Sequence, residues 1–283
     1  MAARPKVFAS LLAEVIRKGQ CTFCGACMAT CPTFALLPTG EEPSLKGQCI
    51  ACQLCYQHCG RTPEGAPYPF EAVEKAVFGQ TRAQEGPGRL IGVYKGVYAA
   101  RSTKEDILKV CQDGGVVTSL LAYELESKTI DAAVTAGLLE SAPWKAMPAV
   151  ALTYQGLLKT AGTKYTASPT LLGLMSAVQE YYKHNVAVVG TPCQIQTLRR
   201  MQTSDFGVSK VAKAAKLAIG LFCFEIYAYD GLMKHLRDTG IEPSAVTRFD
   251  IKKGVFNAET SGTNSLSAKL EQLDHLMKSS CMI

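Results

Sequence analysis

Cysteine is the residue whose number and spacing point most directly to chemistry in this chain of 283 residues. Eight of its twelve cysteines form two runs with one pattern, C-x2-C-x2-C-x3-C: Cys21, Cys24, Cys27 and Cys31, followed by Cys49, Cys52, Cys55 and Cys59. In such a run three thiolates bind one 4Fe-4S cube, and the fourth, turned away, binds the neighbouring cube. Two runs therefore predict two 4Fe-4S clusters. The first would take Cys21, Cys24, Cys27 and Cys59, and the second Cys49, Cys52, Cys55 and Cys31.

Zinc is the alternative metal for closely spaced cysteines. A four-cysteine zinc site, however, takes two separated pairs rather than four thiolates at this interval. Residues 18–62 resemble the bacterial two-cluster ferredoxins, which carry two runs of this kind. Proline usually follows the last ligand of a run in that family, and here Pro32 follows the first run but Gly60 follows the second. We expect this difference to affect a turn and no ligand.

Composition and charge limit the class of protein. The chain is 47% hydrophobic with a net charge of +6, and its basic residues are scattered, which favours an ordinary packed core and no nucleic-acid-binding face. No apolar run approaches the ~18 residues of a membrane-spanning helix, and Glu14 interrupts the apolar part of the opening segment, unlike in a secretory signal peptide. We therefore expect a cytoplasmic protein that contacts a membrane only through a partner complex.

The elements that position the cysteines change along the chain. One apolar helix face precedes the first run, at Phe8, Leu11, Leu12, Val15 and Ile16. A two-cluster ferredoxin-like α+β domain is expected at 1–62, and the Pro- and Gly-rich residues 63–95 predict a linker. Beyond it, short β-rich segments alternate with helical ones, which predicts an α/β domain at 96–283 with a partly parallel sheet. Strands are expected at 96–100, 132–137, 186–190 and 217–223, and helices near 105–127, 170–183, 193–202 and 228–239.

Three segments of the α/β domain could contact a ligand, because ligands of open α/β sheets gather at the carboxyl ends of strands. QDGG, at 112–115, puts two glycines before a helix whose amides could hold a phosphate, although a plain helix cap is the commoner reason for such glycines. AGTKYTASP, at 161–169, offers Lys164 and Tyr165 for phosphate or ring contacts, and an ordinary polar loop explains it equally well. Cys193, in VVGTPCQ, is as easily a small buried residue as a ligand.

Five ordered motifs carry a resemblance to a known family. QDGGVVTSLLAYEL, AGTKYTASP, VVGTPCQIQTLRRMQ, IGLFCFEIYAYDGL and FDIKKGVF resemble the beta-subunit family of F-420-reducing hydrogenase, formate dehydrogenase and F-420H2 dehydrogenase, over about residues 93–283. A ferredoxin head on such a domain is similar to the F subunit of F-420H2 dehydrogenase and to the amino-terminal half of F-420-dependent sulfite reductase. The resemblance implies that the second domain is an α/β flavin-binding domain. Its FAD would exchange hydride with the substrate coenzyme F-420, a 5-deazaflavin, and pass electrons singly to iron-sulfur clusters.

The resemblance also implies roles for particular residues. The implied FAD contacts are Asp113, Gly114, Gly115, Thr118, Gly162, Thr163, Lys164 and Tyr165. A third 4Fe-4S cluster is implied at Cys193, Cys223 and Cys281, with a fourth ligand from a C-x2-C pair that begins at Cys281. Because the chain ends at Ile283, we expect a truncated fragment in which this cluster is incomplete. No residue is assigned as a catalytic acid or base, and Cys111 is expected to serve packing.

The expected function is an oxidoreductase module that links F-420 to one-electron carriers, since a flavin exchanges both hydride and single electrons. Other redox subunits or a fused redox domain are the expected partners. Two alternatives stay open. One is a reductase of the same family that acts on another substrate, such as a chlorophyll-pathway reductase. The other is a non-catalytic electron-transfer subunit whose α/β domain serves only for docking.

Overall fold

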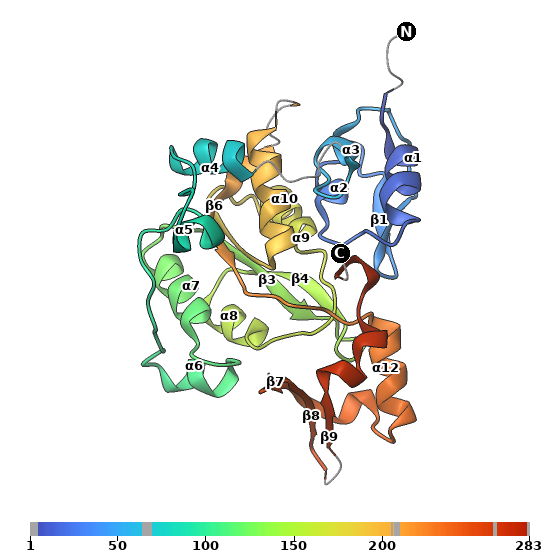
Figure 1. Cartoon of the computed structure of the whole chain (residues 1–283), viewed down its shortest axis with the longest axis vertical. Coiled ribbons are helices and arrows are strands. Elements are labelled where there is room, and N and C mark those ends of the chain that lie inside the picture. Colours follow the sequence, from blue (N-terminus) through green and yellow to red (C-terminus); the bar gives the residue numbers. More distant parts are fainter. Residues whose placement is uncertain (1–4, 64–69, 205, 207–209, 263–264, 282–283) are drawn as a thin grey trace.

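The computed structural model describes residues 5–63, 70–204, 206, 210–262 and 265–281 (Figure 1). A small cysteine-rich head lies beside a larger body built on a central sheet, and a second sheet lies at the far end of that body (Figure 1). None of the helices in these ranges combines the length and the apolar character needed to cross a lipid bilayer.

The head consists of short elements connected by loops. In order they are α1 (Phe8–Leu11), η1 (Leu12–Ile16), α2 (Ala26–Ala29), β1 (Leu36–Thr39), β2 (Glu42–Leu45) and α3 (Leu54–Gln57). β1 and β2 form an antiparallel hairpin in which Leu36 lies opposite Leu45. The predicted helix before the first run is confirmed, and its apolar face is buried in the core of the head through Phe8, Leu11, Val15 and Ile16.

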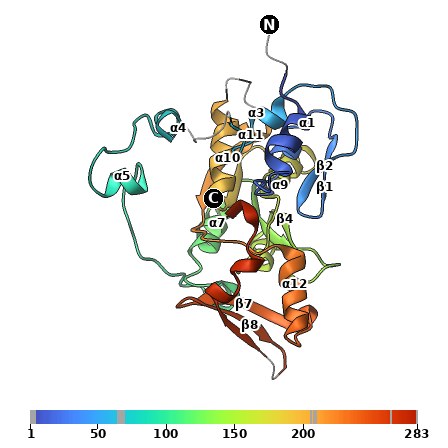
Figure 2. The ribbon, with the colours of Figure 1, turned by 45° about the vertical axis from the view of Figure 1, so that its right-hand side comes forward.

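The connection between head and body contains two helices that the sequence did not predict. α4 (Phe70–Phe78) and α5 (Pro87–Ile91) lie within the expected linker, and Figure 2 shows the segment around α5 standing out from the rest of the molecule. Arg82 pairs with Glu74 at 2.6 Å, which folds the segment back on itself. The predicted linker therefore has local structure of its own.

The central sheet has the strand order β4-β3-β5-β6. Its strands are β3 (Ala132–Leu138), β4 (Ala146–Ala151), β5 (Val186–Gly190) and β6 (Ala215–Gly220). β3, β5 and β6 are parallel, and β4 lies antiparallel to β3 at one edge. The prediction of a partly parallel sheet is confirmed.

Helices cover both faces of this sheet. One layer consists of α9 (Thr170–Gln179), α10 (Pro192–Thr203) and α11 (Lys210–Ala214). The other consists of α7 (Val116–Glu126) and α8 (Tyr154–Thr160), with α6 (Glu105–Val110) beside α8. Val134 and Val188 point into the first core, and Ala133 and Ala187 into the second. This alternation follows from the two-residue period of a strand and explains why parallel strands buried on both faces are apolar throughout.

The second sheet forms a separate unit of packing. It is an antiparallel meander of β7 (Val246–Lys252), β8 (Val255–Thr260) and β9 (Leu266–Lys269). It packs against α12 (Tyr229–Asp238) around the buried rings of Phe249 and Phe256. Four short 3-10 turns complete the body: η3 (Pro243–Ala245), η4 (Leu270–Gln272), η5 (Asp274–Leu276) and η6 (Ser279–Cys281). The chain then returns to the head, where the Ser279 hydroxyl donates to the carbonyl oxygen of Gly19 at 2.8 Å.

One predicted strand is wrong. Residues 96–100 form no strand, and within the described chain no other strand pairs with them. Val97 and Tyr98 are 79% and 87% exposed. β-branched and aromatic residues are common in strands mainly because a sheet buries them. Here the two side chains are exposed, so residue type alone gave a wrong prediction.

Two further boundaries differ from the sequence prediction. The helix expected at 105–127 is broken at 111–115, where Gly115 has a φ of +69° that a helix does not allow. The strand expected at 217–223 ends at Gly220, so Cys223 lies in the loop that follows. The strands at β3 and β5 and the helices α9, α10 and α12 are confirmed, with small shifts of their ends.

The head packs on the body through the loop of its first cysteine run. The amide of Leu171, at the start of α9, donates to the carbonyl oxygen of Cys24 at 3.0 Å. A Cβ on Gly25 would lie 2.6 Å from the Pro169 carbonyl oxygen, so only glycine allows this approach. A Cβ on Gly60 would lie 2.9 Å from the Thr197 hydroxyl of α10. This contact is a physical reason for Gly60 at a position where two-cluster ferredoxins usually have proline.

Candidate functional site

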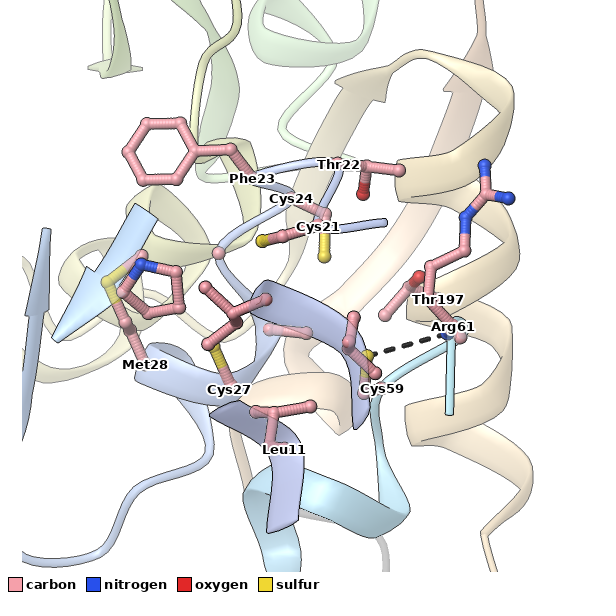
Figure 3. A pocket seen from close by; sticks show the side chains of 16 residues that line it. Leu11, Cys21, Thr22, Phe23, Cys24, Cys27, Met28, Cys59, Arg61 and Thr197 are labelled. Carbon is pink, nitrogen blue, oxygen red and sulfur yellow. Dashed lines mark hydrogen bonds between the residues drawn. The ribbon is translucent and has the colours of Figure 1, made fainter. Parts of the chain in front are cut away.

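Four cysteines of the head surround one cavity, which we call the inner pocket (Figure 3). They are Cys21, Cys24, Cys27 and Cys59. Three come from the first run and one from the end of the second, which is the set that the spacing predicted for the first cluster. Figure 3 shows the four side chains around a common space, while the ring of Phe23 points away from it. Buried apolar residues, among them Leu11, Val15 and Met28, line the rest.

Burial makes these thiols hard to ionise unless a cation lies among them. It raises the pKa of Cys21 to about 11 and the pKa of Cys59 to about 12, and it raises the pKa of Cys27 well above its usual value. Negative charge on neighbouring cysteines raises each pKa further. Cysteines bind metal as thiolates, so iron would supply the positive charge that four converging thiolates need. Arg61 adds an amide donor to the Cys59 sulfur at 3.4 Å (Figure 3).

The other four cysteines of the head surround a second cavity, the outer pocket. They are Cys31, Cys49, Cys52 and Cys55, the set predicted for the second cluster. Burial raises the pKa of Cys55 to about 12, and charge on its three companions adds to the rise. Leu45 and Ile50 also line this pocket, yet their side chains are 44% and 55% exposed.

The two runs share a backbone pattern around their second cysteine. Phe23 and Gly25 flank that cysteine in the first run, with φ of +56° and +91°. Ala51 and Gln53 flank it in the second run, with φ of +57° and +69°. α2 and α3 begin directly after these left-handed turns. The repeated spacing thus gives a repeated turn and helix, which is why each run sends three thiols to one pocket and one to the other.

The cysteine sets of the two pockets are not sites for a single metal ion. Among the described residues, no three His, Cys, Asp or Glu side chains are spaced to hold one metal ion. The ligands of a 4Fe-4S cube bind four different irons and surround the whole cube. The thiols of the inner and outer pockets surround a cavity, which is the arrangement that a cube needs.

A third cavity, of about 700 Å³, lies at the carboxyl ends of the parallel strands. We call it the large cavity, and its volume falls within the ~300–1,000 Å³ typical of small-molecule sites. The position agrees with the rule for open α/β sheets. It is lined by all eight residues that the family resemblance assigned to FAD: Asp113, Gly114, Gly115, Thr118, Gly162, Thr163, Lys164 and Tyr165. The fold therefore brings together two segments that lie far apart in the sequence.

The first turn of α7 faces the large cavity. Gly115 is its N-cap, and a Cβ there would lie 2.7 Å from Cγ2 of the buried Ile107. A Cβ on Gly114 would lie 2.9 Å from the Ala100 carbonyl oxygen. Within the described chain no side chain caps α7, so its first amides can donate to a phosphate. The two glycines thus permit a turn that leaves a helix start open to the cavity.

Lys164 has a role that its residue type did not indicate. Its ammonium donates to the carbonyl oxygens of Thr160, Ala161 and Gly162, the last two at 2.8 and 2.9 Å. Burial lowers its pKa to about 8. The side chain therefore closes the C-terminal end of α8 and holds the following loop against the large cavity. Its neighbour Tyr165 packs edge-on against Phe256 of the second sheet, with 5.6 Å between ring centroids.

Three further cysteines approach one another at the edge of the large cavity. Cys193 lies in the first turn of α10, Cys223 in the loop after β6 and Cys281 in η6. Burial raises the pKa of Cys223 to about 11, and charge on the other two raises it further. Cys193 and Cys223 line the large cavity. Cys193 and Cys281 therefore both lie within electrostatic range of Cys223. The remaining cysteine, Cys111, is buried and donates to the Asp113 carbonyl oxygen at 3.0 Å.

Some residues of the site were missed from the sequence. Thr22 lines both the inner pocket and the large cavity. Thr197 lines the inner pocket, and its hydroxyl donates to the Cys193 carbonyl oxygen at 2.7 Å. Phe222 and Phe224 line the large cavity on either side of Cys223. The aromatic pair in LFCFE was a possible signal, whereas the roles of the two threonines depend on how the head packs on the body.

Three ranges of the chain match known protein families. Residues 97–174 match the N-terminal domain of the family described as coenzyme F-420 hydrogenase/dehydrogenase, beta subunit, and residues 183–283 match the C-terminal domain of the same family. Residues 14–37 match a 4Fe-4S binding domain. The 4Fe-4S match thus covers the first cysteine run of the head, and the other two matches lie in the body.

Individual relatives resemble different parts of the chain. Coenzyme F-420 hydrogenase subunit beta of Methanothermobacter thermautotrophicus is 42% identical over 59% of this chain and 59% of its own length. Coenzyme F-420-dependent sulfite reductase of Methanocaldococcus jannaschii is 36% identical over 86% of this chain and 37% of its own length. A chain in a solved structure of the F-420-reducing NiFe hydrogenase complex from Methanosarcina barkeri is 32% identical, with a TM-score of 0.60 over 66% of this chain and 65% of that chain. The chain thus spans less than two thirds of each of these three proteins.

Proposed function

We infer a function from one premise: this chain belongs to the coenzyme F-420 hydrogenase/dehydrogenase beta-subunit family. The proposed function is an F-420-dependent oxidoreductase module. It would exchange hydride between F-420 and FAD and pass electrons singly to two 4Fe-4S clusters, held in the inner and outer pockets. The observation that carries this proposal is that the large cavity adjoins the inner pocket, with Thr22 lining both.

The residues of the large cavity fit a cofactor that has both a ring system and a phosphate. Gly114 and Gly115 leave the first amides of α7 open to an anion. Thr118 and Thr163 offer hydroxyls from opposite segments of the wall, and Tyr165 offers an aromatic ring. A bound flavin would supply the conversion between hydride and single electrons. The chain's own contribution is to bind the rings and to keep them beside the head.

Cys193, Cys223 and Cys281 support the proposal of a further iron-sulfur cluster near the flavin. The three thiols lie together, and charge on Cys193 and Cys281 acts on Cys223. A cube takes four ligands, so one more would have to complete this site. Clustered thiols of this kind support a cytoplasmic, reducing location. Membrane contact would come only through a partner complex.

The test is the reduction of F-420 by the anaerobically reconstituted protein. With reduced viologen as electron donor, we expect the absorbance of oxidised F-420 to bleach at a rate that depends on bound FAD. The iron content should be about eight atoms per chain for the two clusters of the head alone. A preparation with full iron and stoichiometric FAD that never bleaches F-420 would contradict the proposal. Such a preparation would favour a same-family reductase for another substrate. Full iron without flavin binding would favour an electron-transfer subunit.

A matched pair of glycine variants tests the flavin site itself. Gly115→Ala places a Cβ 2.7 Å from Ile107 at the start of α7, whereas a Cβ on Gly254 has nothing within 4 Å. The two glycines share a positive φ, +69° and +75°. We expect Gly115→Ala to lose most of its FAD and Gly254→Ala to keep it, measured as flavin released from the denatured protein. Equal FAD in both variants would show that α7 does not bind the flavin.

A further inference from the structure

The outer pocket is open to solvent on the side where Leu45 and Ile50 line it. Residues 45–51, which include the pocket cysteine Cys49, are all exposed. When the two cysteine runs are aligned, residues 50–54 correspond to residues 22–26. Residues 50 and 51 are exposed and 52–54 are half-buried, whereas 22–26 are buried except for the half-buried Cys24. A protein partner can therefore approach the outer pocket directly, whereas the body covers the inner one.

The inner pocket lies beside the large cavity. Thr22 lines both spaces. Thr197 lines the inner pocket and donates to the Cys193 carbonyl oxygen at 2.7 Å. Burial raises the pKa of Cys24, and Cys193 lies close enough to raise it further. Electrons that start at the large cavity therefore meet the inner pocket first and the outer pocket last.

Among the described residues, the surface around the outer pocket carries little charge. From residue 45 to residue 53 the sequence is LKGQCIACQ, in which Lys46 is the sole charged residue. The nearby ammonium of Lys6 is paired with the Glu14 carboxylate. Leu45 and Ile50 thus form an apolar rim in a patch of low charge. Such a rim suits a partner whose surface over its own cofactor is uncharged, and it does not suit a strongly acidic or strongly basic partner.

We propose that this rim, Leu45 and Ile50 around the outer pocket, is the docking surface for a one-electron protein carrier with a weakly charged, apolar face. The proposal rests on the proposed function, because it requires a cluster in the outer pocket. Each transfer would move one electron from the reduced outer cluster to the oxidised carrier. The cluster is oxidised, the carrier is reduced, no bond forms or breaks, and no proton moves.

Stopped-flow kinetics tests the docking surface without F-420 or flavin. The protein is reduced with dithionite, freed of excess reductant and mixed with oxidised azurin, a one-electron copper protein of low net charge with an apolar face over its copper. We expect Ile50→Glu and Leu45→Glu each to lower the second-order rate about tenfold, because a charge at the rim opposes desolvation. Ile50→Lys should lower it to a similar extent. Leu37→Glu is the matched control. It adds the same charge to the same hairpin, at an exposed residue (49%) that does not line the outer pocket, and it should change the rate less than about twofold.

Three results would overturn the proposal. The first is an unchanged rate in Ile50→Glu and Leu45→Glu at full iron content. The second is a faster rate in Ile50→Glu with a slower one in Ile50→Lys, which would show that docking is electrostatic. The third comes from hydrogen exchange in the unmodified protein, where added azurin should protect the amides of residues 46–51. Protection elsewhere but not there would place the exit on another surface. Loss of F-420 activity with normal transfer to azurin would instead contradict the proposed function alone.

Discussion

The inner and outer pockets have the same cysteine spacing and the same left-handed turns, but they differ in their surroundings. The inner loop is enclosed by α9 and α10, whereas the outer loop faces solvent. The second cysteine of each run is followed by Gly25 in one and by Gln53 in the other, both with positive φ. Only Gly25 meets the backbone of α9. A similar difference separates Gly60, packed on Thr197, from the exposed Pro32. The residues beside the cysteines therefore differ according to which pocket the body covers.

The largest expected effect comes from removing one ligand of each pocket. Cys24→Ala and Cys49→Ala should each lose about four of about eight irons. In Cys49→Ala, reduced F-420 should still reduce the cluster that remains, because that cluster lies beside the large cavity. In Cys24→Ala, the remaining outer cluster should be reduced more slowly by at least an order of magnitude. Freeze-quenched electron paramagnetic resonance measures both rates. Faster reduction of the remaining cluster in Cys24→Ala than in Cys49→Ala would contradict the assignment of the inner and outer pockets.

A smaller effect is expected from filling the space beside α9. Gly25→Ala would place a Cβ 2.6 Å from a carbonyl oxygen and 2.7 Å from the Leu172 amide, and we expect it to lower the free energy of unfolding by about 3 kcal/mol or more. Gly40→Ala is the control, since Gly40 has a φ of +61° but nothing within 4 Å of its Cβ position. It should cost about 1 kcal/mol, the strain of the left-handed backbone. Thermal or denaturant unfolding of the reconstituted proteins measures both, and equal losses would argue against close packing at Gly25.

The smallest effect is the coupling between Gly60 and Thr197. Gly60→Ala places a methyl group 2.9 Å from the Thr197 hydroxyl, and Thr197→Ala removes that hydroxyl. Because the two changes act on one contact, the double variant should be more stable than the sum of the single effects predicts, by about 1 kcal/mol. A double-mutant cycle of unfolding free energies measures this. Strict additivity would mean that the head does not press on α10 at this point.

The parts of the structure that could be predicted from the sequence are those whose causes are local. The interval within each cysteine run fixes a turn and a helix, so the two thiol sets could be assigned in advance. β3 and β5 could be found because strands buried on both faces are apolar throughout. The hairpin of β7 and β8 was missed. Lys253 and Gly254 at its turn have the positive φ values, +50° and +75°, that a type I′ turn requires, but Lys-Gly is not one of the Asn-Gly or Asp-Gly pairs that signal such a turn in a sequence.

Other features depend on contacts that no local pattern encodes. Val97 and Tyr98 have strand-like side chains but lie exposed, without a strand beside them in the described chain. Lys164 lines the large cavity, and its ammonium also donates to three nearby carbonyl oxygens, a contact that its place in the sequence does not reveal. Thr22 and Thr197 gain their positions from the packing of head on body. Which of the two identical cysteine patterns lies next to the large cavity could not be read from the spacing, because the spacing is the same in both.

The packing of the inner loop links cofactor assembly to the integrity of the body. Ala26 is part of the hydrophobic core between the central sheet and α9, and Cys24 packs against the same core. A chain without iron in the inner pocket would therefore lack the group that keeps the inner loop folded against α9 and the central sheet. We expect such a chain to be cut by proteases near α9 as well as in the head, which limited proteolysis of the iron-free and the reconstituted protein would measure.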